Sequence, residues 1–97
     1  MNKSLTFEIL LPVSIFREGK AFVAYSPALD LSTSGKTFEQ TQKRFHEIVE
    51  IFFEELERKG TTDKVLEGLG WEKSVKSEWV PPTVISHNIM PFQMNYA

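Results

Sequence analysis

Apolar and polar side chains alternate near the start of the chain. Between residues 5 and 16 one side of the alternation is apolar at every second position, formed by Phe7, Ile9, Leu11, Val13 and Ile15. This period is typical of a strand that is half-buried against a core. Pro12 lies within the run and has no N–H to donate, so we expect a bulge or an unpaired position there.

Two further short strands are predicted after the first. Glu18-Gly19 indicates a tight turn, after which residues 22–25 run back as a second strand that Pro27 ends. Residues 31–34 form the third strand. The pattern therefore predicts a three-stranded antiparallel meander.

The period changes to that of a long helix at Thr37. Thr37 and Gln40 have capping-box spacing, and Gly60 suits the left-handed position that ends a helix. Apolar residues recur at steps of three and four and predict a core-facing stripe of Phe38, Phe45, Val49, Phe52 and Leu56. Charged residues lie opposite, where we expect the i,i+4 pairs Glu39–Lys43 and Glu54–Arg58.

More apolar surface is present on this helix than one small sheet would cover. Ile48, Ile51 and Phe53 widen the apolar arc beyond the core stripe. Surplus apolar surface on a small domain often marks an interface. We therefore expect these residues to contact a partner or a second copy.

The C-terminal quarter contains a short helix, a strand and a tail. Thr62 can cap a helix over residues 63–67, and a strand-like run starts at Trp71. Pro81-Pro82 then separates a domain of residues 1–80 from an extended tail of residues 81–97. The tail is too apolar for a plain disordered end, so we expect it to pack on its own subunit, a second subunit or a partner. Its candidate interface residues, with one from the preceding strand, are Trp79, Phe92, Met94 and Tyr96.

Composition limits the classes of function. The 97 residues suffice for one domain with a modest core, and the absence of cysteine excludes disulfides and thiolate metal sites. A net charge of −2 without a basic stripe argues against autonomous nucleic-acid binding. No apolar stretch approaches the roughly 20 residues that cross a bilayer, and Glu8 and Pro12 interrupt the first apolar run. We expect a soluble cytoplasmic protein without membrane contact.

Residues with catalytic potential are scattered. His46 and Glu50 could form a pair on the helix flank, but a metal site needs three or four convergent ligands. His87 has no neighbouring acid or nucleophile in the tail. A meander followed by a helix also begins the ribonuclease H-like nucleases, whose metal site would use Glu8 with Asp30 here. The helix acids follow the solvated side, so we expect no catalytic, cofactor or metal site, and a residual nuclease is the weakest alternative.

One junction superficially resembles the end of a phosphate-binding loop. Ser34-Gly35-Lys36-Thr37 lacks the preceding glycine at the spacing that such a loop requires. We expect Gly35 to supply a flexible junction and Thr37 to cap the helix.

The stretch from Phe22 to Leu56 resembles the HicB family of antitoxins, which belong to toxin–antitoxin pairs. The segments that carry the resemblance are FVAY at 22–25, SPALDL at 26–31 and SGKT at 34–37, followed by Glu39 and the helix. The family's usual Pro-Gly after the turn is Leu31-Ser32 in this chain. The resemblance covers roughly residues 5–70.

The resemblance implies an α+β, partial ribonuclease H-like fold, in which the helix packs on one face of the meander and a fourth strand lies beside the first. It implies a domain without nuclease activity that neutralises a small basic HicA-type mRNA-cleaving toxin by direct binding, and that forms dimers or larger homo-oligomers. Many members add a C-terminal DNA-binding domain, but only residues 81–97 follow the core here, so DNA binding is not expected. The alternative is a non-catalytic homo-oligomeric scaffold or regulator without a toxin.

Overall fold

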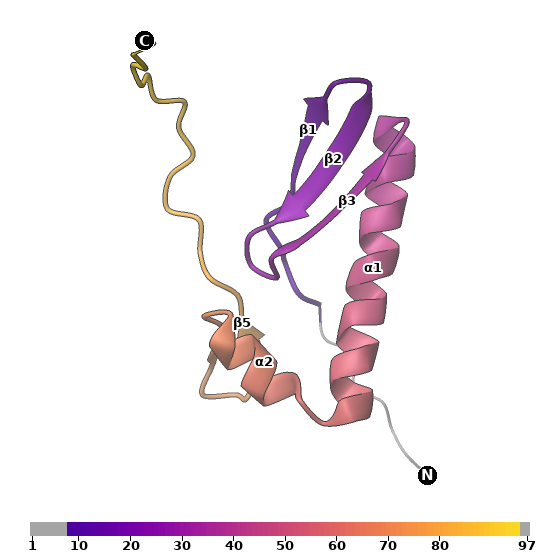
Figure 1. The fold of residues 1–97 in the computed structure, drawn as a ribbon. Helices are drawn as coiled ribbons and strands as arrows, with labels where there is room; N and C mark the ends of the chain where they lie inside the picture. The colour runs from indigo at the N-terminus through magenta and orange to yellow at the C-terminus, as the bar shows by residue number, and fades with distance from the viewer. Residues whose placement is uncertain (1–7, 96–97) are drawn as a thin grey trace.

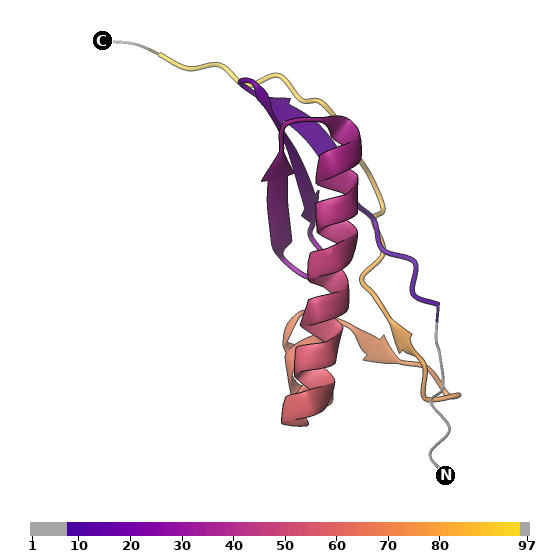
Figure 2. The ribbon, with the colours of Figure 1, turned by 90° about the vertical axis from the view of Figure 1, so that its right-hand side faces the viewer.

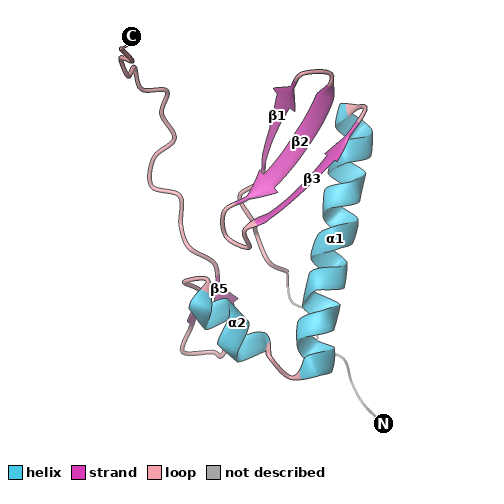
Figure 3. Cartoon of the chain, viewed as in Figure 1, coloured by secondary structure: helices cyan, strands magenta, loops and turns pink. Residues whose placement is uncertain are grey.

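The computed structural model describes residues 8–95 and confirms the α+β class (Figures 1 and 3). A three-stranded antiparallel sheet is followed by a long helix, a short helix and a two-stranded sheet. The elements are β1 (Ser14–Glu18), β2 (Ala21–Ser26), β3 (Leu31–Gly35), α1 (Phe38–Lys59), α2 (Thr62–Gly68), β4 (Glu72–Lys73) and β5 (Trp79–Val80).

The first sheet is the predicted meander, in the order β1-β2-β3. Glu18 pairs with Ala21, so Gly19 and Lys20 form a two-residue turn, and Gly19 takes the positive φ of 62° that such turns need. Strand β1 begins only at Ser14, not at residue 5 as expected, because Pro12 cannot donate to a ladder. Residues 8–13 form a lead segment without ladder pairing, and residues 5–7 lie outside the described residues.

Helix α1 begins and ends as the capping signals predict. The Thr37 hydroxyl accepts a hydrogen bond from the Gln40 N–H at 3.0 Å, and Gly60 ends the helix at φ 67°. The Gln40 side chain reaches one residue further back than in a capping box, since its Oε1 accepts from the Lys36 N–H at 2.7 Å. Two backbone N–H groups at the helix start are therefore satisfied by side chains.

The first turn of α1 lies very close to β3. Gly35 is buried, and a Cβ added there would lie 2.6 Å from Thr41 Oγ1. Thr41 is itself fully buried, and its hydroxyl lies within hydrogen-bond distance of the Thr37 and Phe22 carbonyls, at 2.8 and 3.3 Å. The expected role of Gly35 was flexibility, but the structure shows that it gives space for this close approach.

Helix α1 packs mainly on β3 and β2 and covers β1 little, as Figure 2 shows with the helix in front of the sheet. The core continues below the sheet, where α1 meets α2 and the start of β4. Its buried members are Ala28, Leu29, Leu56, Leu66 and Trp71.

Trp71 joins this lower part to the sheet. The side chain is 2% exposed, and its Nε1–H donates to the Ala28 carbonyl at 2.8 Å across 43 residues of sequence. The Phe53 ring meets Trp71 edge-on, with ring centroids 6.2 Å apart. The indole therefore connects the turn between β2 and β3 to the end of α1. It also connects this turn to α2, β4 and β5, which we call the lower lobe.

The fourth strand does not lie beside the first. Strand β4 pairs antiparallel with β5 in a separate sheet, with Lys73 opposite Trp79. A local turn closes this hairpin: Ser77 N–H donates to the Ser74 carbonyl, and Ser74 Oγ accepts from the Glu78 N–H. The pairing of β4 is thus local, and within residues 8–95 β1 has β2 as its one ladder partner.

Candidate protein-binding surfaces

An apolar groove runs between α1 and the N-terminal side of the sheet. We call it the β1–α1 groove; its volume is about 740 Å³ and its lining is Ile9, Leu10, Leu11, Val13, Ile15, Phe38, Gln42, Phe45, His46 and Val49. Eight of these ten side chains are apolar, and none carries a fixed charge. Such a lining is typical of a surface that binds another apolar segment.

The groove exists because α1 lies over β3 and β2 rather than over β1. Alternate residues of the lead segment, Ile9, Leu11 and Val13, line the side that α1 leaves open, and Ile15 of β1 continues this row. Phe38 was expected in the core stripe, yet it is 44% exposed and forms one wall of the groove. Leu10, at 77% exposure, stands at the same opening.

The C-terminal tail is the second exposed apolar feature. From Thr83 to Asn95 the chain is extended, joins neither sheet and has exposed side chains throughout (Figure 1). Its large apolar members range from 51% to 99% exposed and are Val84, Ile85, Ile89, Met90, Phe92 and Met94. No Asp, Glu, Lys or Arg occurs from Trp79 to the end of the sequence, although such residues make up 25% of the whole chain.

The outer face of α1 has a different character. Ile51 is 57% exposed there, and Glu47 and Glu54 lie four and three residues from it, so they share its side of the helix. Glu50 lies three and four residues from these two acids and extends the charged side. His46 Nδ1 lies 3.1 Å from Glu50 Oε1, while Glu47 and Glu54 make no ion pair with the described side chains. We call Glu47, Glu50, Ile51 and Glu54 the acidic face: one exposed apolar side chain beside three exposed carboxylates.

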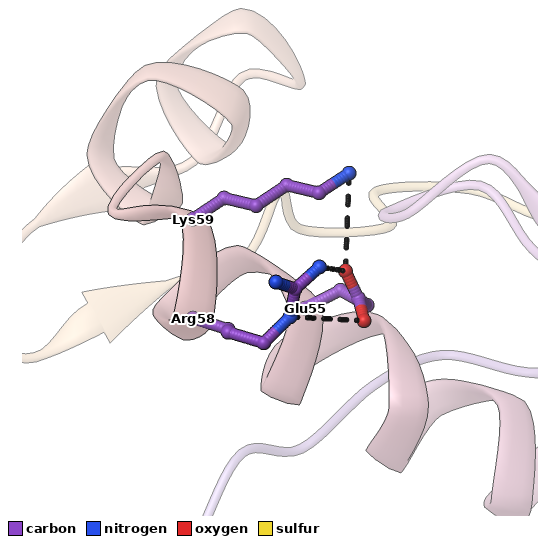
Figure 4. A network of polar contacts seen from close by, with 3 residues as sticks. All are labelled: Glu55, Arg58 and Lys59. Atoms are coloured by element: carbon purple, nitrogen blue, oxygen red, sulfur yellow. Dashed lines mark hydrogen bonds and ion pairs between the residues drawn. The ribbon is translucent and has the colours of Figure 1, made fainter.

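A charged cluster lies where α1 ends (Figure 4). Arg58 donates to both carboxylate oxygens of Glu55, at 2.8 and 3.3 Å, and Lys59 Nζ lies 3.8 Å from Glu55 Oε2. The hydrogen bonds from Arg58 lower the pKa of Glu55, and the positive charge of Lys59 adds to this effect. The expected pair Glu54–Arg58 is therefore wrong, because the bidentate geometry with Glu55 holds the Arg58 guanidinium.

The interface residues expected from the sequence lie in three different places. Ile51 belongs to the acidic face and Ile48 lies half-buried beside it, while Phe92 and Met94 are exposed on the tail. Two residues pack within the chain instead: Phe53 contacts Trp71, and the Trp79 ring lies 5.1 Å from Lys73 Nζ. Tyr96 lies outside the described residues.

Sequence reasoning did not identify the β1–α1 groove. Its residues follow ordinary strand and helix periods, which predict burial rather than exposure. The missing signal was the position of α1 on the sheet, which depends on the close approach of Thr41 to Gly35. That contact holds the start of α1 against β3.

The acids considered for a nuclease do not form a cluster. Asp30 lies in the turn before β3 at φ 52°, and its Oδ1 accepts a hydrogen bond from the Tyr25 hydroxyl at 3.1 Å. This hydrogen bond, together with a small burial effect and the charge of Asp30, raises the pKa of Tyr25 above its usual value of 10.0. Glu8 is exposed in the lead segment, and residues 8–95 contain no group of three or more acidic or histidine side chains that could hold a metal ion.

Comparisons with known proteins return no match: no family model, no curated protein and no solved structure corresponds to this chain. Within the part of the chain that the structure describes, neither helix is long and apolar enough to span a bilayer.

Proposed function

We propose that this chain is a protein-binding module of the HicB antitoxin type, which neutralises a small basic mRNA-cleaving toxin by direct contact. The observation that carries the proposal is the acidic face of α1, where exposed Ile51 lies beside the exposed carboxylates of Glu47, Glu50 and Glu54. Protein interfaces commonly combine an apolar anchor with a polar rim. The carboxylates would attract a basic partner and orient its approach.

Local features of the acidic face suit this role. Helix α1 has 22 residues capped at both ends, so it presents these side chains from a rigid element. Glu47 and Glu54 are free of ion pairs to described side chains, so their interaction with a cationic partner would not first require an internal pair to break. The resemblance of residues 22–56 to the antitoxin family supports the same assignment, and the partner would be encoded next to this gene.

Co-expression with the adjacent small open reading frame tests the proposal. The expected result is growth arrest by the neighbour alone, restored growth when this chain is co-expressed, and a complex on co-purification. The triple variant Glu47→Lys, Glu50→Lys, Glu54→Lys should lose both rescue and complex. A matched control with the same change of net charge is Glu18→Lys, Glu67→Lys, Glu78→Lys, whose positions are exposed and lie outside α1.

Two outcomes would remove the antitoxin role. One is a neighbour that is neither toxic nor retained on purification. The other is equal rescue by both triple variants, since a partner indifferent to the acidic face does not bind it. A stable homo-oligomer without a toxic neighbour would favour the alternative, a non-catalytic scaffold or regulator.

A further inference from the structure

The tail and the β1–α1 groove are complementary in chemistry. Both are apolar, both are exposed, and neither carries a fixed charge within the segments that would meet. Exposed apolar side chains gain free energy when they leave water, in proportion to the area they bury. We propose that the tail of one copy of this chain lies in the β1–α1 groove of a second copy, and reciprocally. This inference is independent of the proposed toxin.

The alternation of the tail gives it one apolar edge. Met90, Phe92 and Met94 occupy every second position and share one face of an extended segment, whereas Gln93 and Asn95 share the other. Methionine side chains adapt to irregular apolar surfaces, and one phenylalanine supplies a large anchor between them. The groove wall from Ile9 to Ile15 is about 20 Å long, a length that six or seven extended residues would fill.

The backbone of the groove wall can also take part. Residues 8–13 have no ladder partner among the described residues, so their C=O groups and, except at Pro12, their N–H groups are open to an added strand. Addition of an extended segment to an unpaired edge is a common mode of peptide recognition. It would also remove an exposed edge from each copy.

The start of the tail favours a second copy over the tail's own groove. Val80 to Val84 lie beside Leu10, Leu11 and Pro12, at the rim of the groove. Pro81 and Pro82 hold the backbone extended at this point. The tail that follows has exposed side chains, and no residue of it lines the groove of its own copy (Figure 1). Thirteen residues from Thr83 to Asn95 reach about 40 Å, enough to cross to a neighbouring molecule.

The size of the exchanged surface approaches that of a standard interface. About seven tail residues and the ten residues that line the groove provide about 17 residues per copy, and specific interfaces use about 20–30 on each side. Because the exchange is reciprocal, each copy contributes both a tail and a groove, as two-fold symmetry requires.

Solution mass and paired variants test the inference. The full chain should be a dimer, and Phe92→Asp with Met94→Asp should weaken dimerisation at least about 100-fold, because two apolar side chains would lose their burial. Gln93→Asp with Asn95→Asp adds the same charge on the other face and should leave the dimer intact. Val13→Asp in the groove wall should act like the first pair. All three variants should keep the circular dichroism of the parent chain.

Isotope-filtered NMR identifies the occupant of the groove. One copy carries labelled methionine methyls and the other carries labelled isoleucine, leucine and valine methyls. Nuclear Overhauser contacts from Met90 and Met94 to Leu10, Leu11 or Val13 across differently labelled copies are expected. The inference is overturned by a monomer, by contacts confined to one copy, by no contact, or by equal weakening in both tail variants.

Discussion

At the scale of single residues, two close contacts hold the rest of the chain to the three-stranded sheet: one holds α1, and the other holds the segment that follows α2. Thr41 meets Gly35 where α1 leaves β3, and Trp71 donates its indole N–H to Ala28. Each contact joins segments that would otherwise depend on a small core. A domain of this size has a free energy of unfolding of only about 5–10 kcal/mol, so each contact is a measurable part of it.

Gly35→Ala tests the first contact. The added methyl group would lie 2.6 Å from Thr41 Oγ1, so the start of α1 must move, and we expect a loss of about 1–3 kcal/mol in the free energy of unfolding. Urea unfolding measures it. Gly68→Ala is the matched control: no atom lies within 4 Å of the added Cβ, and the expected change is zero or slightly stabilising. Equal effects of the two substitutions would contradict the account.

The Tyr25–Asp30 hydrogen bond predicts a dependence on high pH. The pKa of Tyr25 is raised in the folded chain, so the protonated phenol contributes stability below pH 10.0, and this contribution is lost as pH rises through the raised pKa. Asp30→Asn removes the charge and should lower the pKa of Tyr25 toward 10.0. Ultraviolet titration of the phenol follows the change, and an unaltered titration in the variant would refute the assignment.

At the scale of elements, the patterns of the sequence predicted most of the structure because they are local. The meander and the caps of α1 follow from alternation, capping residues and glycine positions. The short α2 is also present, but Thr62 is its first residue and not its cap, and the cap position, Thr61, makes no side-chain hydrogen bond. Two features were not predicted. The lateral position of α1, which opens the β1–α1 groove, depends on contacts distant in sequence. The pairing of β4 with β5 is local, but the family resemblance suggested β1 as the partner of β4.

Trp71→Phe tests how the lower lobe is attached. The ring remains apolar, but the Ala28 carbonyl loses its buried partner, so we expect a loss of about 1–3 kcal/mol. Hydrogen exchange should speed up in α2, while the amides that pair β1 with β2 change less. Lys73→Met, which removes the exposed cation over Trp79, is the control and should change stability by less than about 1 kcal/mol. An equal rise in amide hydrogen exchange across the whole chain would show that the lower lobe does not open separately from the sheet.

At the scale of the whole molecule, two surfaces of opposite character lie on one small domain. The β1–α1 groove and the tail are uncharged and apolar, which suits association between copies. The acidic face of α1 combines three carboxylates with one exposed apolar residue, Ile51, and this combination suits a basic partner. Because the two surfaces use different residues, an exchanged dimer would leave both acidic faces open, and each proposal can fail without the other.

Calorimetric titration of this chain with the purified product of the adjacent gene tests the central proposal most directly. If a basic partner binds the acidic face, binding should be saturable and should weaken as salt rises. The Glu47→Lys, Glu50→Lys, Glu54→Lys variant should bind at least about tenfold more weakly. The Glu18→Lys, Glu67→Lys, Glu78→Lys control should retain at least half of the parent affinity. Absence of binding, or equal loss in both variants, would contradict the account.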